Sequence, residues 1–137
     1  MSTLSNTDLT VADANITTLK DASGNNPSSP AEIHTGRAKA WVNFNGTSFG
    51  ERDSFNIASQ TDHGTGRYTV TIDNDMSNVN YSVVAAGCYD VTDTTNMPMQ
   101  GPATNTIAVG SFMLHCGSNT FAYDDWEIVT AVVFGDT

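Results

Sequence analysis

The residues best suited to acid–base or nucleophilic chemistry are the three histidines and two cysteines of the chain. His63 follows Asp62 in a glycine-rich stretch, and His115 directly precedes Cys116. Because neighbouring residues of a strand point to opposite faces, His115 is poorly placed to activate the Cys116 thiol. Gly64-Thr65-Gly66 lacks the lysine and helix of a phosphate-binding loop, so a hairpin turn explains it better. We therefore expect no catalytic residues and no enzyme activity.

Acidic residues gather in two segments and could supply oxygen ligands for Ca²⁺. One segment is Asp73-Asn74-Asp75, and the other contains Asp124-Asp125 and Glu127. Neither has the spacing of an EF-hand loop, and the sequence does not give the carboxylate separation that defines a glycosidase pair. Solvated turn residues are the favoured interpretation, with a calcium site as the alternative. We expect no metal and no cofactor.

Aromatic residues raise a different possibility, because a sugar ring could stack on Trp41, Trp126, Tyr89 or Tyr123. We expect Trp41 and Trp126 in the hydrophobic core, with sugar stacking as the alternative, whereas Tyr89 borders the longest apparent loop, Asp90 to Asn105. Long loops in compact domains are commonly binding or assembly elements. The candidate ligand-binding residues lie where this loop begins: Tyr89, Asp90, Asp93 and Asn96.

Composition limits the class of partner. The 137 residues suit one domain, and 15 acidic against 5 basic residues give a net charge of -10. Such a charge repels the phosphates of nucleic acid and of anionic membranes, so nucleic-acid binding is not expected. No apolar run approaches the roughly 18 to 20 residues of a membrane helix, so membrane insertion is not expected either. The start of the chain lacks the features of a signal peptide, which favours synthesis in a cytoplasm. Cys88 and Cys116 are expected to be free thiols rather than a disulfide scaffold.

Alternation of apolar and polar residues predicts a series of short strands from Ala38 onward. Asn45-Gly46 should close a tight hairpin. The strand at 127–134 is apolar on both faces, which predicts a central strand or one whose second face meets another chain. The strands at 67–73 and 80–89 should be neighbours in one antiparallel sheet. The predicted fold is an all-β antiparallel β-sandwich or jelly-roll-like domain, with strands near 38–44, 53–58, 67–73, 80–89, 106–116, 120–123 and 127–134.

The first 35 residues differ from the rest because they contain few aliphatic side chains. Ser23 to Pro30 is rich in serine, asparagine, glycine and proline, which is typical of a linker. Pro30 to Ile33 could open a helical turn, with proline at its first position. We expect a largely irregular N-terminal attachment segment and linker at 1–35, followed by the β-domain at 36–137.

Several stretches together resemble a known family. Gly-Arg-Ala-Lys-Ala-Trp-Val-Asn-Phe-Asn-Gly-Thr at 36–47 resembles the start of a β-rich domain in tail-fibre and related structural proteins of bacteriophages. The similarity spans about the last three-quarters of the chain and part of the leader. The other matching stretches are 18–21, 52–57, 61–70, 80–84 and 132–136.

The resemblance implies a short homotrimeric virion fibre on the surface of the phage particle. Its N-terminal segment would attach to a tail, baseplate or capsid protein, and its β-domain would bind a host-surface glycan during adsorption. One alternative is a head fibre, capsid decoration or tail adaptor protein without receptor binding. Another is a polysaccharide-degrading tail enzyme, which the absence of a catalytic motif disfavours.

Overall fold

A computed structural model describes residues 18–20, 23–25, 27–90, 107–117 and 122–137 of the chain. The chain divides into two compact units, Met1–His34 and Thr35–Thr137. The second unit contains all the strands of the described residues and is the part that carries the candidate site. Among the described residues, no helix is both long enough and apolar enough to cross a membrane.

Helix α1, Pro30–Gly36, begins with the proline that the sequence placed at its first position. Ser29 and Glu32 form a reciprocal cap: the Ser29 hydroxyl accepts from Glu32 N–H at 3.2 Å, and the Glu32 carboxylate accepts from Ser29 N–H at 2.7 Å. The backbone and hydroxyl hydrogen bonds from Ser29 lower the pKa of the Glu32 carboxyl. The predicted helical turn is therefore confirmed, and it extends to Gly36.

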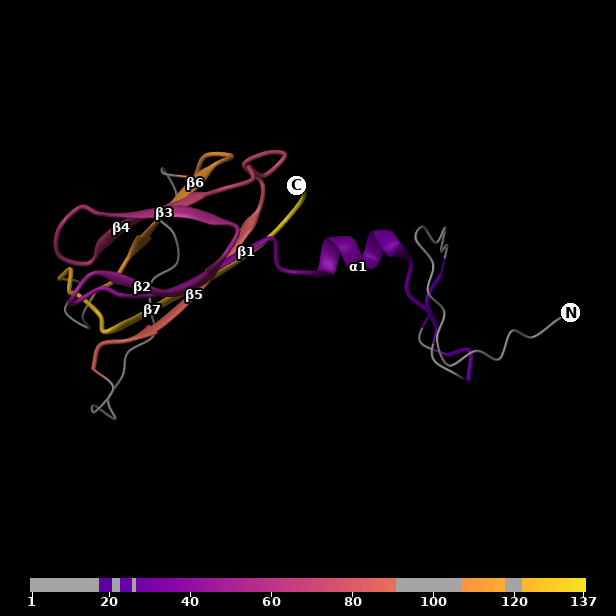
Figure 1. Cartoon of the computed structure of the whole chain (residues 1–137), viewed down its shortest axis with the longest axis horizontal. Coiled ribbons are helices and arrows are strands. Elements are labelled where there is room, and N and C mark those ends of the chain that lie inside the picture. Colours follow the sequence, from indigo (N-terminus) through magenta and orange to yellow (C-terminus); the bar gives the residue numbers. More distant parts are fainter. Residues whose placement is uncertain (1–17, 21–22, 26, 91–106, 118–121) are drawn as a thin grey trace, which may run out of the picture. The chain divides into compact units, whose positions relative to one another are not determined.

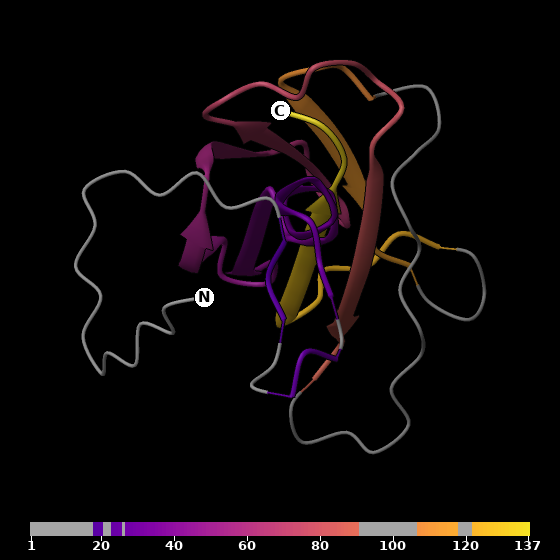
Figure 2. The same ribbon diagram turned by 90° about the vertical axis from the view of Figure 1, so that its right-hand side faces the viewer.

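The described residues of the second unit form seven strands in two antiparallel sheets (Figure 1). One sheet has four strands in the order β2-β1-β7-β5, and the other has three in the order β3-β4-β6. Turned by 90°, the ribbon shows β7 (yellow) between β1 and β5 (Figure 2). The strands are β1 Ala40–Asn45, β2 Gly50–Phe55, β3 Ile57–Asp62, β4 Arg67–Ile72, β5 Ser82–Cys88, β6 Ser111–His115 and β7 Ile128–Phe134.

Period-two burial produces the core between the sheets. On β1, β4, β6 and β7 every second side chain is buried, and the side chains between them are not. The all-β sandwich is thereby confirmed, as is the central position of β7. Trp126, just before β7, is 1% exposed and completes the core. The buried residues are Ala40, Val42, Phe44, Tyr68, Val70, Ile72, Met76, Tyr81, Phe112, Leu114, Cys116, Trp126, Val129, Ala131 and Val133.

Trp41 does not lie in this core, so the expectation for that residue is wrong. It is half-buried on β1 and alternates with the buried Ala40 and Val42. Its side chain therefore lies on the outer face of the four-stranded sheet. The core position that a large aromatic residue would fill on this strand belongs instead to Phe44.

The strand predicted at 53–58 is in fact the meeting point of two strands from different sheets. Asn56 separates β2 from β3 and has a φ of 56°, a left-handed conformation that asparagine tolerates better than most residues. Its amide donates to Lys39 C=O at 3.0 Å and its oxygen accepts from Asn74 N–H at 2.8 Å. These bonds fix the corner at which the chain passes from one sheet to the other.

The strands predicted at 67–73 and 80–89 are not neighbours. β4 pairs with β3 and β6, whereas β5 pairs with β7 in the other sheet. The polar segment between them is thus a crossing between sheets. Hydrogen bonds from Met76 N–H to Val109 C=O and from Ser77 N–H to Asp136 C=O hold that segment at the end of the sandwich.

Two further boundaries differ from the expectation. Asn45 and Gly46 have negative φ and do not form a tight two-residue hairpin; residues 46–49 make a longer turn, with φ of 22° at Phe49. The strand predicted at 106–116 is shorter and covers Ser111–His115. Of the short strand expected near 120–123, residues 120 and 121 lie outside the described residues, and Tyr123 forms an isolated bridge with Gly117.

Candidate functional site

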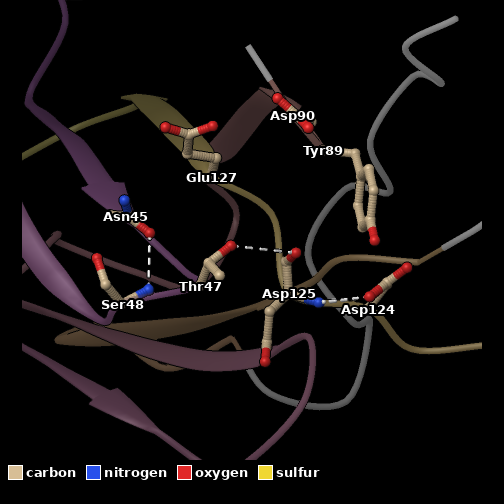
Figure 3. A pocket seen from close by; sticks show the side chains of 8 residues that line it. All are labelled: Asn45, Thr47, Ser48, Tyr89, Asp90, Asp124, Asp125 and Glu127. Atoms are coloured by element: carbon tan, nitrogen blue, oxygen red, sulfur yellow. Dashed lines mark hydrogen bonds between the residues drawn. The ribbon is translucent and has the colours of Figure 1, made fainter. Parts of the chain in front are cut away.

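A polar pocket of about 480 Å³ lies at one end of the sandwich, where three separate segments meet (Figure 3). The turn between β1 and β2 supplies the first wall, the residues after β5 the second, and the residues before β7 the third. The lining residues are Asn45, Thr47, Ser48, Tyr89, Asp90, Asp124, Asp125 and Glu127.

The turn after β1 is held by hydrogen bonds of the Asn45 and Thr47 side chains and of the Gly46 backbone. Asn45 Oδ1 accepts from Ser48 N–H at 2.9 Å, which closes the turn as an Asx-type interaction. Gly46 N–H donates to Trp126 C=O at 2.8 Å, and Thr47 Oγ1 lies 3.5 Å from Asp125 C=O. The first wall is thereby attached to the third.

The second wall is fixed by the end of β5. Glu127 N–H donates to Tyr89 C=O at 3.1 Å, and Cys88 Sγ donates to Asp90 C=O at 3.0 Å. Both bonds use backbone carbonyls, so they constrain the chain without using the side chains of Tyr89 or Asp90. Tyr89 remains 47% exposed, with its ring available to a ligand.

Asp125 lines the pocket, but its carboxylate is part of the fold. Its Oδ1 accepts from the buried Tyr68 hydroxyl and from Gly66 N–H, both at 2.7 Å. In Figure 3 this carboxylate points away from Glu127 and Asp90. Burial, together with the Asp125 carboxylate, raises the pKa of the Tyr68 hydroxyl, so that hydroxyl remains a donor. We assign Asp125 a structural role.

Asp90, Asp124 and Glu127 make the pocket acidic, and Asn45, Thr47 and Ser48 add neutral polar groups. Carboxylates accept hydrogen bonds from hydroxyl groups, and an exposed aromatic ring stacks on apolar faces of ligands. Negative charge also opposes the entry of anions. The arrangement suits a neutral or cationic polyhydroxylated ligand better than a sulfated or carboxylated one.

Two of the four predicted ligand-binding residues, Tyr89 and Asp90, line this pocket. Asp93 and Asn96 lie outside the described residues. Their role in binding stays a prediction. The prediction omitted Asn45, Thr47 and Ser48, because nothing in the sequence brings a turn near residue 47 to residues 89 and 124.

His115 and Cys116 lie on opposite sides of the sheet at the end of β6. Cys116 is buried in the core and His115 lies on the outer side of β6, against the Tyr123 ring at 5.2 Å between centroids. Cys88 and Cys116 are both free thiols, as expected. The Asp62–Gly66 segment is a hairpin turn between β3 and β4, closed by His63 N–H donating to Arg67 C=O at 2.9 Å.

The acidic segments do not form a recognisable metal site in the described part of the chain. Within those residues there is no group of three or more histidine, cysteine, aspartate or glutamate side chains placed to hold a metal ion.

Comparison with protein-family models, with curated proteins and with solved structures finds no match to this chain.

Proposed function

We propose that this protein is a non-enzymatic component of a bacteriophage virion, a short homotrimeric fibre whose β-sandwich binds a host-surface glycan. The resemblance of residues 36–47 and of the later stretches to phage fibre proteins supports the virion assignment. The observation that carries the binding role is the exposed Tyr89 ring beside a pocket rich in hydrogen-bond acceptors. In this proposal the N-terminal segment attaches to another virion protein.

The charge of the pocket narrows the glycan class. Asp90, Asp124 and Glu127 disfavour sulfated or uronic-acid sugars and favour neutral hexoses or amino sugars. Tyr89 would stack on a pyranose face, while the carboxylates and the amide of Asn45 accept from its hydroxyl groups.

The test is binding of the purified full chain to an array of bacterial surface polysaccharides, with Tyr89→Ala as the informative variant. Tyr123→Ala is the matched control, because Tyr123 is similarly exposed, at 52%, and is not among the pocket residues. We expect Tyr89→Ala to weaken binding to neutral glycans at least tenfold and Tyr123→Ala to leave it nearly unchanged. Equal binding by Tyr89→Ala and the wild type would contradict the assigned site.

Location and activity separate the alternatives. Immunogold labelling of phage particles should place the chain at the tail, whereas head labelling without glycan binding would indicate a head fibre or decoration protein. Release of reducing sugar from a bound polysaccharide would contradict the non-enzymatic assignment. Multi-angle light scattering should give three times the chain mass of 14.6 kDa.

A further inference from the structure

An apolar row crosses the outer face of the four-stranded sheet from edge to edge. Phe55 on β2 lies opposite Trp41 on β1, Trp41 lies opposite Val132 on β7, and Val132 lies opposite Val84 on β5. Because neighbouring strands are about 4.8 Å apart, the row extends over roughly 14 Å.

These four side chains lie on the side of the sheet away from the core. Phe55 is 54% exposed and Val84 58% exposed, while Trp41 and Val132 are half-buried. The other sheet of the sandwich has a different outer face: its row of Ser59, Thr71 and Ser111 is entirely hydroxylated. An antiparallel sheet facing water normally carries polar residues, so the apolar row indicates a covered face.

Charge favours a second copy of the chain as the occupant. On β1, β7 and β5 the outward-facing side chains include no charged residue, and on β2 the charged Asp53 lies opposite Asn43, in the outward-facing pair next to the row. The chain as a whole has a net charge of -10. Two copies meeting through this face keep most of their carboxylates away from the contact, which limits their mutual repulsion.

The row is also complementary in size to itself. Its β2–β1 half carries the large rings of Phe55 and Trp41, and its β7–β5 half carries the smaller Val132 and Val84. In a closed ring of three, the aromatic half of each copy would meet the valine half of the next.

We propose that this face is the surface through which copies of the chain associate, with the Phe55–Trp41 half of one copy against the Val132–Val84 half of another. The proposal rests on the homotrimer of the proposed function and assigns its contact. It does not depend on glycan binding, because the pocket and the row involve different residues.

Sedimentation velocity of the full chain over a concentration series tests the surface, with Val84→Lys as the disrupting variant. Val79→Lys is the matched control, since Val79 is 50% exposed in the segment before β5 and lies outside the row. Both substitutions reduce the net negative charge by one, so added repulsion cannot explain dissociation. We expect Val84→Lys to raise the protein concentration at which half of the chains are dissociated at least tenfold. Val79→Lys should leave that concentration within twofold of the wild-type value.

The outcomes distinguish the two proposals. A trimeric wild type whose Val84→Lys variant associates equally well would overturn the interface and leave the trimer intact. Equal dissociation of Val79→Lys and Val84→Lys would also overturn it. A monomeric wild type at every concentration would remove both trimer and interface. Circular dichroism and urea unfolding check that each variant is folded; if Val84→Lys does not fold, Phe55→Ser, with Val79→Ser as control, takes its place.

Cross-linking tests the arrangement within the contact. In a Cys88→Ser background, Phe55→Cys and Val84→Cys chains are mixed under mild oxidation. We expect a disulfide between the two variants and little between copies of either variant alone. Efficient cross-linking of Phe55→Cys chains to each other would contradict the packing of rings against valines.

Discussion

At the scale of single residues, the hydrogen bond between Tyr68 and Asp125 connects the core to the pocket. The Tyr68 hydroxyl is buried and donates to the Asp125 carboxylate at 2.7 Å. We expect Tyr68→Phe to lower the free energy of unfolding by about 1.5 to 3 kcal/mol, the range for hydrogen bonds to charged groups. Urea denaturation monitored by tryptophan fluorescence measures this change.

Tyr81→Phe is the comparison for that variant. The Tyr81 hydroxyl lies 2.8 Å from the carbonyl oxygens of Ala108 and Ser111, which are neutral acceptors. Its loss should cost about 0.5 to 1.5 kcal/mol. If Tyr81→Phe lowers the free energy of unfolding more than Tyr68→Phe does, the charge of the Asp125 acceptor does not strengthen the Tyr68 hydrogen bond.

Buried thiol and phenol groups predict a loss of stability at alkaline pH. Burial, and secondarily the Asp125 charge, raises the pKa of Cys116 from 9.0 to about 12. Burial raises the pKa of Tyr81 from 10.0 to about 12. Below pH 9 both groups are protonated in the folded and unfolded states. As pH rises toward 12 the unfolded state loses these protons first, so stability falls.

The free energy of unfolding should begin to fall near pH 9, where unfolded Cys116 ionises, and fall more steeply from pH 10, where unfolded Tyr81 ionises. Each group contributes up to about 1.4 kcal/mol per pH unit. Cys116→Ala should remove the fall between pH 9 and 10. Urea unfolding at intervals from pH 7 to 11 measures both slopes. An unchanged slope between pH 9 and 10 in Cys116→Ala would refute this origin.

At the scale of elements, Asn56 determines where one sheet ends and the other begins. Its tolerance of a φ of 56° and its side-chain hydrogen bonds to Lys39 C=O and Asn74 N–H contribute separately to stability. Asn56→Ala should add left-handed backbone strain and remove the hydrogen bonds, which together should lower the free energy of unfolding by about 2 to 4 kcal/mol. Asn56→Gly relieves the strain and should cost about 1 to 2 kcal/mol less. If Asn56→Ala and Asn56→Gly have equal free energies of unfolding in urea, the left-handed backbone conformation at residue 56 contributes little to the loss of stability.

The hairpin between β3 and β4 contains two glycines with positive φ but different surroundings. A Cβ atom on Gly66, at φ 65°, would collide with the backbone oxygen of Cys116 and with the backbone of Asp124. At Gly64, with φ 90°, the nearest atom is the end of Arg67 at 3.6 Å. We expect Gly64→Ala to cost about 1 to 2 kcal/mol from backbone strain, and Gly66→Ala at least about 2 kcal/mol more. Thermal unfolding of the two variants gives the comparison.

The sequence predicts the interior of strands better than their boundaries and partners. Tyr68, Val70 and Ile72 alternate clearly and are all buried. By contrast, no residue between Asp53 and Ala58 predicts that the chain passes from one sheet to the other, because Asn56 is compatible with a turn or with an exposed strand position. The pairing of β4 and β5 was predicted from proximity in the chain, but the turn between them crosses the sandwich.

At the scale of the whole molecule, the candidate pocket depends on topology. Tyr89 and Asp90 could be proposed from the adjacent loop, whereas Asn45 and Glu127 join them only because β1 and β5 both pair with β7. The outer-face row has the same origin: Phe55, Trp41, Val132 and Val84 are unrelated in sequence until the register aligns them. Both features required the three-dimensional pairing of strands.

The division of the chain into Met1–His34 and Thr35–Thr137 leads to the last prediction. Within the part of the chain that the structure describes, the buried core residues all belong to the second unit, so a chain of residues 35–137 should fold alone. We expect its free energy of unfolding in urea to lie within about 0.5 kcal/mol of that of the full chain, as for substitutions remote from a core. Glycan binding should persist, because the pocket lies entirely within this unit.

Incorporation into phage particles should be lost if residues 1–34 form the attachment segment. A truncated chain that unfolds more readily by several kcal/mol would show instead that the leader stabilises the sandwich, and its recovery in purified virions would place the attachment surface on the sandwich itself.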